Sequence, residues 1–420
     1  PAGNEEKLAY AYLYGADAAY IGIGSFSLRA RADNFSPGNN LALAGRLAAL
    51  KDAKKLYGAF NIFFRNRDIA GLEERIEEIG RLPFDAYIVS DLGAFNLLRR
   101  RLPGAKFHLS TQANSINAES VKAYRDLGFS RVILGREATL EDIEEIRRAV
   151  PDIELEVFVH GAMCLAWSGR CYLSSYLAGR SANLGDCTHS CRWHYRLLEE
   201  KERPGEYLPV IEDGSYTTIL SSKDLNMFDH LDRLRDAGVD SIKIEGRMKS
   251  LYYTAVVTRA YRRALDRIEP QACSAAGRTP PDDAELEKHR QELTNVSHRE
   301  YSTGFYFGER DADETTEGSY RRRYEFLGLV GEPVHGSGET DAAGSRLYAL
   351  EVRNSIREGE EIEFIGPGTI SVPDERFAIY DESGARVVQA NRGPAEFYIS
   401  PTVPVAPGHI IRKKRGTESP

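Results

Sequence analysis

The strongest indication of the fold is an alternation of two segment types along the first 250 residues. Short β-like runs alternate there with charged segments of helical period. This alternation predicts a parallel sheet with helices packed outside it. About eight repeats over such a length favour a (β/α)8 barrel of the TIM type over an open sheet. The predicted strands are 19–23, 56–64, 85–90, 106–111, 131–135, 154–160, 217–222 and 241–245, with 217–222 also compatible with a hairpin.

Charged, helix-period segments fill the spaces between these runs. Thr139, or a neighbouring residue, is suited to cap one of them, since Glu141 and Asp142 would place acidic groups in its first turn. The predicted helices are 71–80, 118–127, 140–149 and 227–237.

Polar residues follow several of the predicted strands. In a barrel, all strand carboxyl ends open onto one face, where such side chains would meet. Their convergence predicts a polar pocket on that rim. The polar strand ends are 90–91, 110–112, 135–137, His160, 222–224 and 245–247.

The remainder of the chain has a different pattern. From residue 323 on, short β-like runs are separated by Gly, Pro, Asp and Asn turns, with no helical segment between them. This predicts a small all-β barrel. We therefore expect three parts: a catalytic TIM-like barrel over 1–265, a linker or helical excursion over 266–322, and a small β-barrel over 323–415.

Composition excludes some classes of protein. With 55 Lys and Arg against 63 Asp and Glu, the net charge is −8, which argues against broad nonspecific nucleic-acid binding but not against a local basic face. No apolar run approaches the ~18 residues of a membrane span, so no membrane partner is expected. The first residues show no basic segment followed by an apolar one, so no export signal is predicted. A cytoplasmic location follows as the expectation.

Four of the five cysteines lie within 28 residues, in the pattern C-x6-C-x15-C-x3-C. Four thiolates are the usual ligands of an iron–sulfur cluster or a structural zinc. The first pair is wider than the C-x2-4-C spacing typical of zinc, and no third cysteine follows the C-x3-C pair as radical-SAM chemistry requires. Ordinary buried thiols are the alternative. The four are Cys164, Cys171, Cys187 and Cys191.

Five motifs together resemble the collagenase-like, "unassigned peptidase" family. The resemblance covers nearly the whole chain and is most similar to the family's bacterial tRNA hydroxylases, which form 5-hydroxyuridine at the wobble position. Other members hydroxylate a ribosomal RNA cytidine or ubiquinone precursors. The motifs are PAGN at 1–4, EVFVHGAMC at 156–164, SGRCYLSS at 168–175, SKDL at 222–225 and IKIEGRMKS at 242–250.

The resemblance implies a 4Fe–4S cluster, dependence on prephenate as co-substrate, and hydroxylation that needs no molecular oxygen. It assigns the four clustered cysteines as the cluster's ligands. Cys273 is the other possible downstream thiol, and Cys191 fits better as the fourth ligand. The resemblance also implies that the anticodon region of a tRNA is the macromolecular substrate and that the β-barrel over 323–415 is a possible tRNA-binding domain. Oligomeric state is not predicted.

Three residues are candidates for proton transfer during pyrimidine hydroxylation. His160, at a predicted strand end four residues before Cys164, is the first, with a hydrogen-bonded core histidine as the alternative. Glu245 and Asp224 could orient cations or accept a proton, or they could form structural pairs with Lys243 or Lys223.

Prephenate carries two carboxylates, so its site should contain guanidinium or ammonium groups. We expect at least two of four rim cations to contact it. Gln112 could read a base edge or a carboxylate, or serve only as a turn residue. The four cations are Arg136, Arg170, Lys223 and Arg247.

Two basic runs, 321–323 and 412–415, flank the predicted β-domain and suit contact with phosphates, although such runs are often solvated surface. Trp167, Trp193 and Tyr172 could stack on an unpaired base or simply pack.

A peptidase remains the main alternative function. The nine histidines include no H-E-x-x-H pair, and the chain has no G-x-S-x-G nucleophile elbow. The same residues leave open a zinc-structured binding module, and also a hydroxylase that acts on another RNA base or on a ubiquinone precursor.

Overall fold

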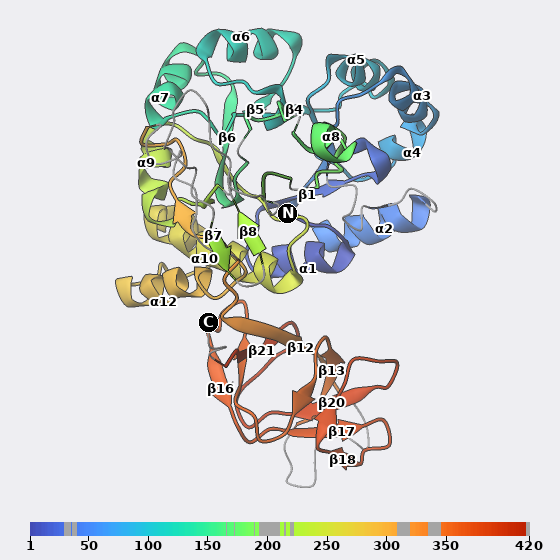
Figure 1. The fold of residues 1–420 in the computed structure, drawn as a ribbon, viewed down its shortest axis with the longest axis vertical. Coiled ribbons are helices and arrows are strands. Elements are labelled where there is room, and N and C mark those ends of the chain that lie inside the picture. The colour runs from blue at the N-terminus through green and yellow to red at the C-terminus, as the bar shows by residue number, and fades with distance from the viewer. Residues whose placement is uncertain are drawn as a thin grey trace.

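The computed structural model describes residues 1–28, 35, 40–164, 166–171, 173–188, 190–192, 211–213, 216–218, 222–308, 320–334 and 346–416. Its larger part is mixed α/β, with a parallel sheet surrounded by helices (Figure 1). A smaller, antiparallel β half-barrel lies below it in Figure 1.

The parallel sheet forms as the alternating pattern predicts, because its central strands are buried on both faces. Neighbouring strands follow chain order from β1 to β6, and β10 then pairs with β6. The parallel strands are β1 (Ala18–Gly22), β2 (Lys55–Phe60), β3 (Ala86–Val89), β4 (Phe107–Leu109), β5 (Arg131–Ile133), β6 (Glu154–Ala162) and β10 (Ser241–Ile244).

The end of β6 adds two short strands to the sheet. β9 (Asp224–Asn226) runs antiparallel to it, and β11 (Tyr301–Ser302) pairs with β9. The predicted strand at 217–222 is wrong as a barrel strand: β7 (Ile211–Asp213) and β8 (Tyr216–Thr218) form a separate antiparallel hairpin.

Closure of the predicted barrel is not seen. In the described residues, no backbone ladder joins β10 to β1, and a cavity of about 490 Å³ lies between them. A side-chain bond crosses this gap, from the Tyr20 hydroxyl to the Ile244 carbonyl (3.0 Å).

Helices cover the outer face of this sheet with their apolar sides. Thr139 caps α7, and its hydroxyl accepts a bond from the Asp142 amide (3.1 Å). The long α10 was not predicted; residues 251–261 are all buried, and its charged side chains are concentrated in its second half. The helices are α1 (Glu5–Leu13), α2 (Asn40–Lys51), α3 (Asn66–Glu74), α4 (Ile76–Gly80), α5 (Leu92–Arg101), α6 (Ala118–Leu127), α7 (Leu140–Ala149), α8 (Leu173–Ala178), α9 (Leu231–Asp236), α10 (Leu251–Ile268), α11 (Pro270–Ala275) and α12 (Asp283–Leu293).

The half-barrel has its own apolar core, which includes Phe364, Ile379 and Ile399. Its central strand, β21, pairs with both β12 and β15. The strands of this sheet are β12 (Tyr324–Pro333), β13 (Tyr348–Val352), β15 (Ile362–Ile365), β16 (Val372–Asp374), β17 (Ala378–Asp381), β18 (Arg386–Val387), β20 (Phe397–Ser400) and β21 (Ile410–Lys414). β14 (Ile356–Arg357) and β19 (Gln389–Ala390) form a separate pair.

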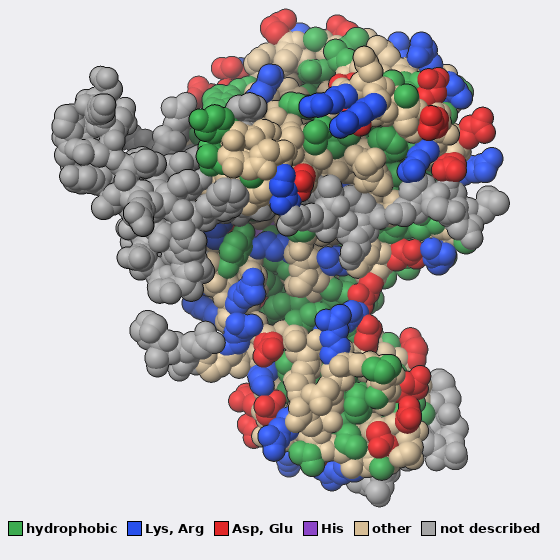
Figure 2. Space-filling model, turned by 45° about the vertical axis from the view of Figure 1, so that its right-hand side comes forward, with side chains coloured by type: hydrophobic (Ala, Val, Ile, Leu, Met, Phe, Trp, Pro, Cys, Tyr) green, Lys and Arg blue, Asp and Glu red, His purple; other side chains and the backbone are tan. Residues whose placement is uncertain are grey.

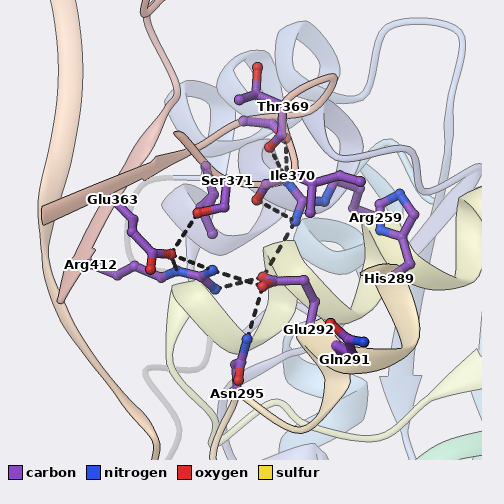
Figure 3. Close-up of polar contacts among 12 residues, drawn as sticks. Arg259, His289, Gln291, Glu292, Asn295, Glu363, Thr369, Ile370, Ser371 and Arg412 are labelled. Carbon is purple, nitrogen blue, oxygen red and sulfur yellow. Dashed lines mark hydrogen bonds and ion pairs between the residues drawn. The ribbon is translucent and has the colours of Figure 1, made fainter. Parts of the chain in front are cut away.

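A buried ion network joins the two parts (Figure 3). Arg412 of β21 donates to Glu292 of α12 (2.6 Å) and to Glu363 of β15 (2.7 Å). Arg259 of α10 donates to the Gly366 carbonyl of the half-barrel (2.6 Å). Because both arginines are almost fully buried, these bonds replace their hydration and hold the two parts together.

Candidate functional site at the carboxyl edge of the sheet

A pocket lies where the parallel strands end, and we call it the rim pocket. Among the described residues that line it, three cations face a single carboxylate, Glu245. A positive excess in a partly buried site suits an anion. The lining residues are Tyr20, Leu28, Ala59, Asn61, Ile88, Ser110, Thr111, Gln112, Ile133, Arg136, Phe158, Lys243, Glu245 and Arg247.

Arg136 follows β5 and lies on the wall of the rim pocket. Its guanidinium is 3.7 Å from the Glu245 carboxylate and 3.9 Å from the centre of the Phe158 ring. The ring and the carboxylate hold the guanidinium of Arg136 at the wall of the pocket, and a guanidinium is a group that can bind a planar anion through two donors.

Three rim residues come from one short stretch within and after β10. Lys243, Glu245 and Arg247 are spaced by two, so an extended chain puts them on one face. Arg247 is buried and donates to the Ser27 hydroxyl (2.8 Å). This places a second guanidinium beside that of Arg136 in the lining of the pocket.

The Glu156 carboxylate and the Tyr20 ring fix the position of the Lys243 ammonium. The ammonium is 2.7 Å from the buried carboxylate of Glu156 and 4.2 Å from the centre of the Tyr20 ring. Burial alone would raise the pKa of Glu156, but Lys243 and Arg131 hold it at about 2. The carboxylate therefore stays ionised and anchors both cations under the pocket.

Some of the residues that the sequence predicted at the rim line the rim pocket, and others do not. Gln112, Arg136, Glu245 and Arg247 come together in the rim pocket, as their strand-end positions indicate. Arg170 is exposed and Lys223 half-buried, and neither lines it. Lys243 and Asn61 line the pocket and were not predicted to do so; the spacing of two from Glu245 is the signal that could have found Lys243.

His160 is placed outside the rim pocket. It is 1% exposed and lies between Tyr261, 3.2 Å from its Nδ1, and Tyr301, 3.4 Å from its Nε2. Burial lowers the pKa of His160 to about 3, so the imidazole is neutral at physiological pH. This environment favours a core histidine over an acid–base group facing a substrate.

Asp224 also lies in a buried pair. Its carboxylate accepts bonds from Arg299 Nε (2.9 Å) and Nη2 (2.6 Å). Burial alone would raise the pKa of Asp224, but the Arg299 guanidinium holds it below its ordinary value. The structure pairs Asp224 with a cation, as in the alternative considered for it, but this cation is Arg299, which is 75 residues away in sequence and carried no sequence signal, and not Lys223.

The segment that carries the four cysteines, residues 164–191, contacts the rim. The Ser168 amide donates to Glu137 (2.7 Å), and the Phe63 amide donates to the Asn183 carbonyl (3.1 Å). Gly169 lies so close to the Gln112 backbone that a Cβ atom would be 2.2 Å from the Gln112 carbonyl oxygen. Only glycine fits there, at a φ of +74°.

The donor set of this segment suits a thiolate-bound cluster, but its arrangement does not form one. Cys164 is exposed, and Cys171, Cys187 and Cys191 are half-buried. Within the described residues, which include all four, no three Cys, His, Asp or Glu side chains are gathered closely enough to hold a metal ion. Binding a cluster would therefore require this segment to draw its thiols together.

The aromatic residues near the cysteines are only partly described. Trp167 is 53% exposed, and Tyr172 and Trp193 lie outside the described residues. No helix in the described part of the chain has both the length and the apolar character that crossing a membrane requires.

Comparison with known proteins identifies the family. Residues 3–316 match the model of peptidase family U32, and residues 322–412 match that of its C-terminal domain. The "tRNA hydroxylation protein P" of Escherichia coli is 36% identical over 87% of this chain and 85% of its own. The E. coli "23S rRNA 5-hydroxycytidine C2501 synthase" is 35% identical over 66% of this chain and 41% of its own. The "Collagenase" of Porphyromonas gingivalis is 29% identical over 88% of this chain and 86% of its own. The chain belongs to peptidase family U32.

Proposed function

We propose that this protein is a tRNA hydroxylase that converts the wobble uridine to 5-hydroxyuridine. The relatives named for hydroxylation of tRNA and of a ribosomal RNA cytidine support an RNA hydroxylase. The observation that carries the proposal is the rim pocket, where Arg136, Lys243 and Arg247 gather around one carboxylate.

The cations of the rim pocket fit the dianionic co-substrate prephenate, which we propose as the second substrate. Arg136 and Arg247 would each bind a carboxylate through two parallel N–H donors, and Lys243 would add a point charge beside them. Glu245, 3.7 Å from Arg136, would orient that guanidinium. Gln112 and Asn61 would bind neutral oxygen or amide groups.

The rim pocket is small in this structure, with a cavity volume of about 50 Å³. Segment 164–191 presses on Gln112 through Gly169, so its movement away from the rim would enlarge the pocket.

We propose a 4Fe–4S cluster on Cys164, Cys171, Cys187 and Cys191. When bound, such a cluster supplies one-electron chemistry or an acidic iron, in a reaction that does not use molecular oxygen. The support is the donor set itself: four thiols on one short segment that touches the rim.

Iron content tests this assignment separately from activity. Protein purified without oxygen should be brown and hold about four irons per chain. Cys171→Ala should lose iron, whereas Cys273→Ala, which alters a buried thiol in α11, should keep it. Equal iron in both variants, or a colourless protein with one zinc, would contradict the cluster.

We also propose that the parallel sheet completes a (β/α)8 barrel. The bond from Tyr20 to the Ile244 carbonyl supports this, because it brings β1 and β10 to opposite sides of one narrow cavity. A closed barrel would direct every strand end to the same rim.

Nucleoside mass spectrometry tests the function. A strain that lacks the gene should lose 5-hydroxyuridine from its tRNA, and the wild-type chain should restore it. Arg136→Ala should not restore it, whereas Arg148→Ala, an exposed change on α7, should. Unchanged hydroxyuridine in the deletion strain would overturn the proposal, and gelatin cleavage that survives replacement of all four cysteines would indicate a peptidase.

A further inference from the structure

A set of exposed cations gathers where the half-barrel meets the α/β part. We call it the junction patch: Arg321, Arg322, Arg323, Lys414 and Arg415, all exposed. Pairing of β12 with β21 sets Tyr324 opposite Lys414, and the Arg415 amide donates to the Arg323 carbonyl (2.9 Å). Two basic runs that lie far apart in sequence thus form one surface. Figure 2 shows Lys and Arg side chains gathered between the two parts of the molecule.

The second basic run, residues 412–415, contains two cations that pair within the protein and two that are exposed to solvent. Arg412 is buried in the ion network with Glu292 and Glu363, and Lys413 is 3.0 Å from the carboxylate of Glu360. These two cations are used within the protein. Lys414 and Arg415, at the end of the same strand, are exposed to solvent.

Acidic groups compensate this patch only in part. Arg321 is 3.1 Å from Glu300, and Arg323 donates to the Thr294 hydroxyl (3.2 Å). In the part of the chain that the structure describes, Arg322, Lys414 and Arg415 have no carboxylate within ion-pair distance. The protein has a net charge of −8, so this local excess of positive charge indicates a binding surface for a polyanion.

One side-chain contact links the chain next to the patch with the loop that follows β10. Tyr320 precedes Arg321, and the Lys249 ammonium is 4.3 Å from the centre of the Tyr320 ring. Lys249 is two residues beyond Arg247, which lines the rim pocket. The patch is therefore connected, through Tyr320 and Lys249, to the loop that carries the rim residue Arg247.

We propose that the junction patch binds the phosphate backbone of the RNA whose base enters the rim pocket. This rests on the proposed function. Flexible, exposed arginine and lysine side chains fit repeated phosphates, which position an RNA without reading its sequence. A membrane surface fits less well, because no large exposed apolar side chain in the described residues belongs to the patch.

The test compares two triple variants that each remove three positive charges. Arg322→Ala/Lys414→Ala/Arg415→Ala alters the patch, and Arg81→Ala/Arg100→Ala/Arg148→Ala alters exposed arginines at the end of α4, on α5 and on α7. Binding of an unmodified tRNA transcript is measured over a range of salt concentrations. Thermal unfolding of both variants should match the wild type, since all six side chains are exposed.

The patch variant should bind tRNA roughly ten- to a hundredfold more weakly at 0.1 M salt, and its slope of log K against log salt should fall by about 2 to 3. The control should match the wild type. Equal weakening of both variants, equal binding by all three proteins, or no binding by the wild type would overturn the proposal. The Arg322→Glu single variant gives a second test and should weaken binding more than Arg100→Glu.

This binding measurement needs no catalysis, so it separates the two proposals. If the wild type binds through the patch but no strain or assay shows hydroxylation, the surface assignment stands and the proposed function fails. If the patch variant hydroxylates and binds tRNA as the wild type does, the function stands and the surface assignment fails.

Discussion

Two buried charge clusters in this protein differ in what they face. At the junction, Arg412 and Arg259 meet Glu292, Glu363 and backbone carbonyls, so the protein itself supplies the partners (Figure 3). At the rim, Glu156 anchors Lys243 and Arg131 from below, while Lys243, Arg136 and Arg247 line a cavity. The first arrangement suits structural attachment, and the second suits an anionic ligand.

The two clusters should respond differently to mutation. Removing a junction charge should reduce stability, because it leaves buried partners without compensation. Removing a cation that lines the rim pocket should reduce substrate use more than stability, because one side of that cation borders a cavity, whereas the Glu156 carboxylate beneath these cations should contribute to stability. Four experiments test this difference.

Arg412→Met should have the largest effect, a loss of about 3–5 kcal/mol in the free energy of unfolding, because Glu292 and Glu363 remain buried without their cation. Chemical denaturation of the whole chain measures it. The double variant Arg412→Met/Glu292→Met should recover part of the loss. A change below about 1 kcal/mol in the single variant would show that water already solvates this network.

The ionised Glu156 carboxylate should contribute to the free energy of unfolding, and this contribution should decrease at acid pH. The folded pKa of Glu156, about 2, lies below the ordinary 4.5, so its stabilisation is complete above pH 4.5 and is lost as the pH falls toward 2. The shift corresponds to roughly 3 kcal/mol. Denaturation of the wild type and of Glu156→Gln, followed from pH 6 to pH 2.5, should show a difference that shrinks with falling pH. A constant difference would contradict ionised Glu156 as the anchor.

Arg136→Ala should lower kcat/KM for tRNA hydroxylation roughly a hundredfold, or about 2.7 kcal/mol. Its stability should change by less than about 1 kcal/mol, since the side chain borders a cavity. Arg136→Lys keeps the charge but loses the planar fork, and should recover only part of the activity. Equal losses of stability and activity would make Arg136 a structural residue like Arg412.

Lys413→Ala should have the smallest effect, below about 1 kcal/mol, although Lys413 adjoins Arg412 in sequence. Its pair with Glu360 is partly exposed, so water screens it. Thermal unfolding measures the change. An effect as large as that of Arg412→Met would mean that the network extends to the strand surface.

Most strands of the parallel sheet, and the strand-end positions of several residues of the rim pocket, could be predicted from runs of neighbouring residues in the sequence. Polar residues follow several parallel strands, and such strands bring their carboxyl ends to one edge. Gln112 and Arg136 follow β4 and β5, and Glu245 and Arg247 follow β10, so their positions in sequence predicted that they lie together. The basic run at 412–415 was expected to contact phosphates or to be solvated surface. Residues 412–414 instead belong to β21, and only the pairing with β12 and β15 reveals this strand.

The alternating α/β pattern, the separate β-rich part and the grouping of four cysteines could all be established from the order of the residues, because they depend on near neighbours and on period. Three other features emerge only once the chain is folded: Arg299 pairs with Asp224, Arg412 is buried while Lys414 is exposed, and His160 lies among tyrosines. Burial and partners of a charged side chain depend on segments far away in the chain. A charged residue in a sequence therefore indicates a possible ligand, and its surroundings in space decide whether it is one.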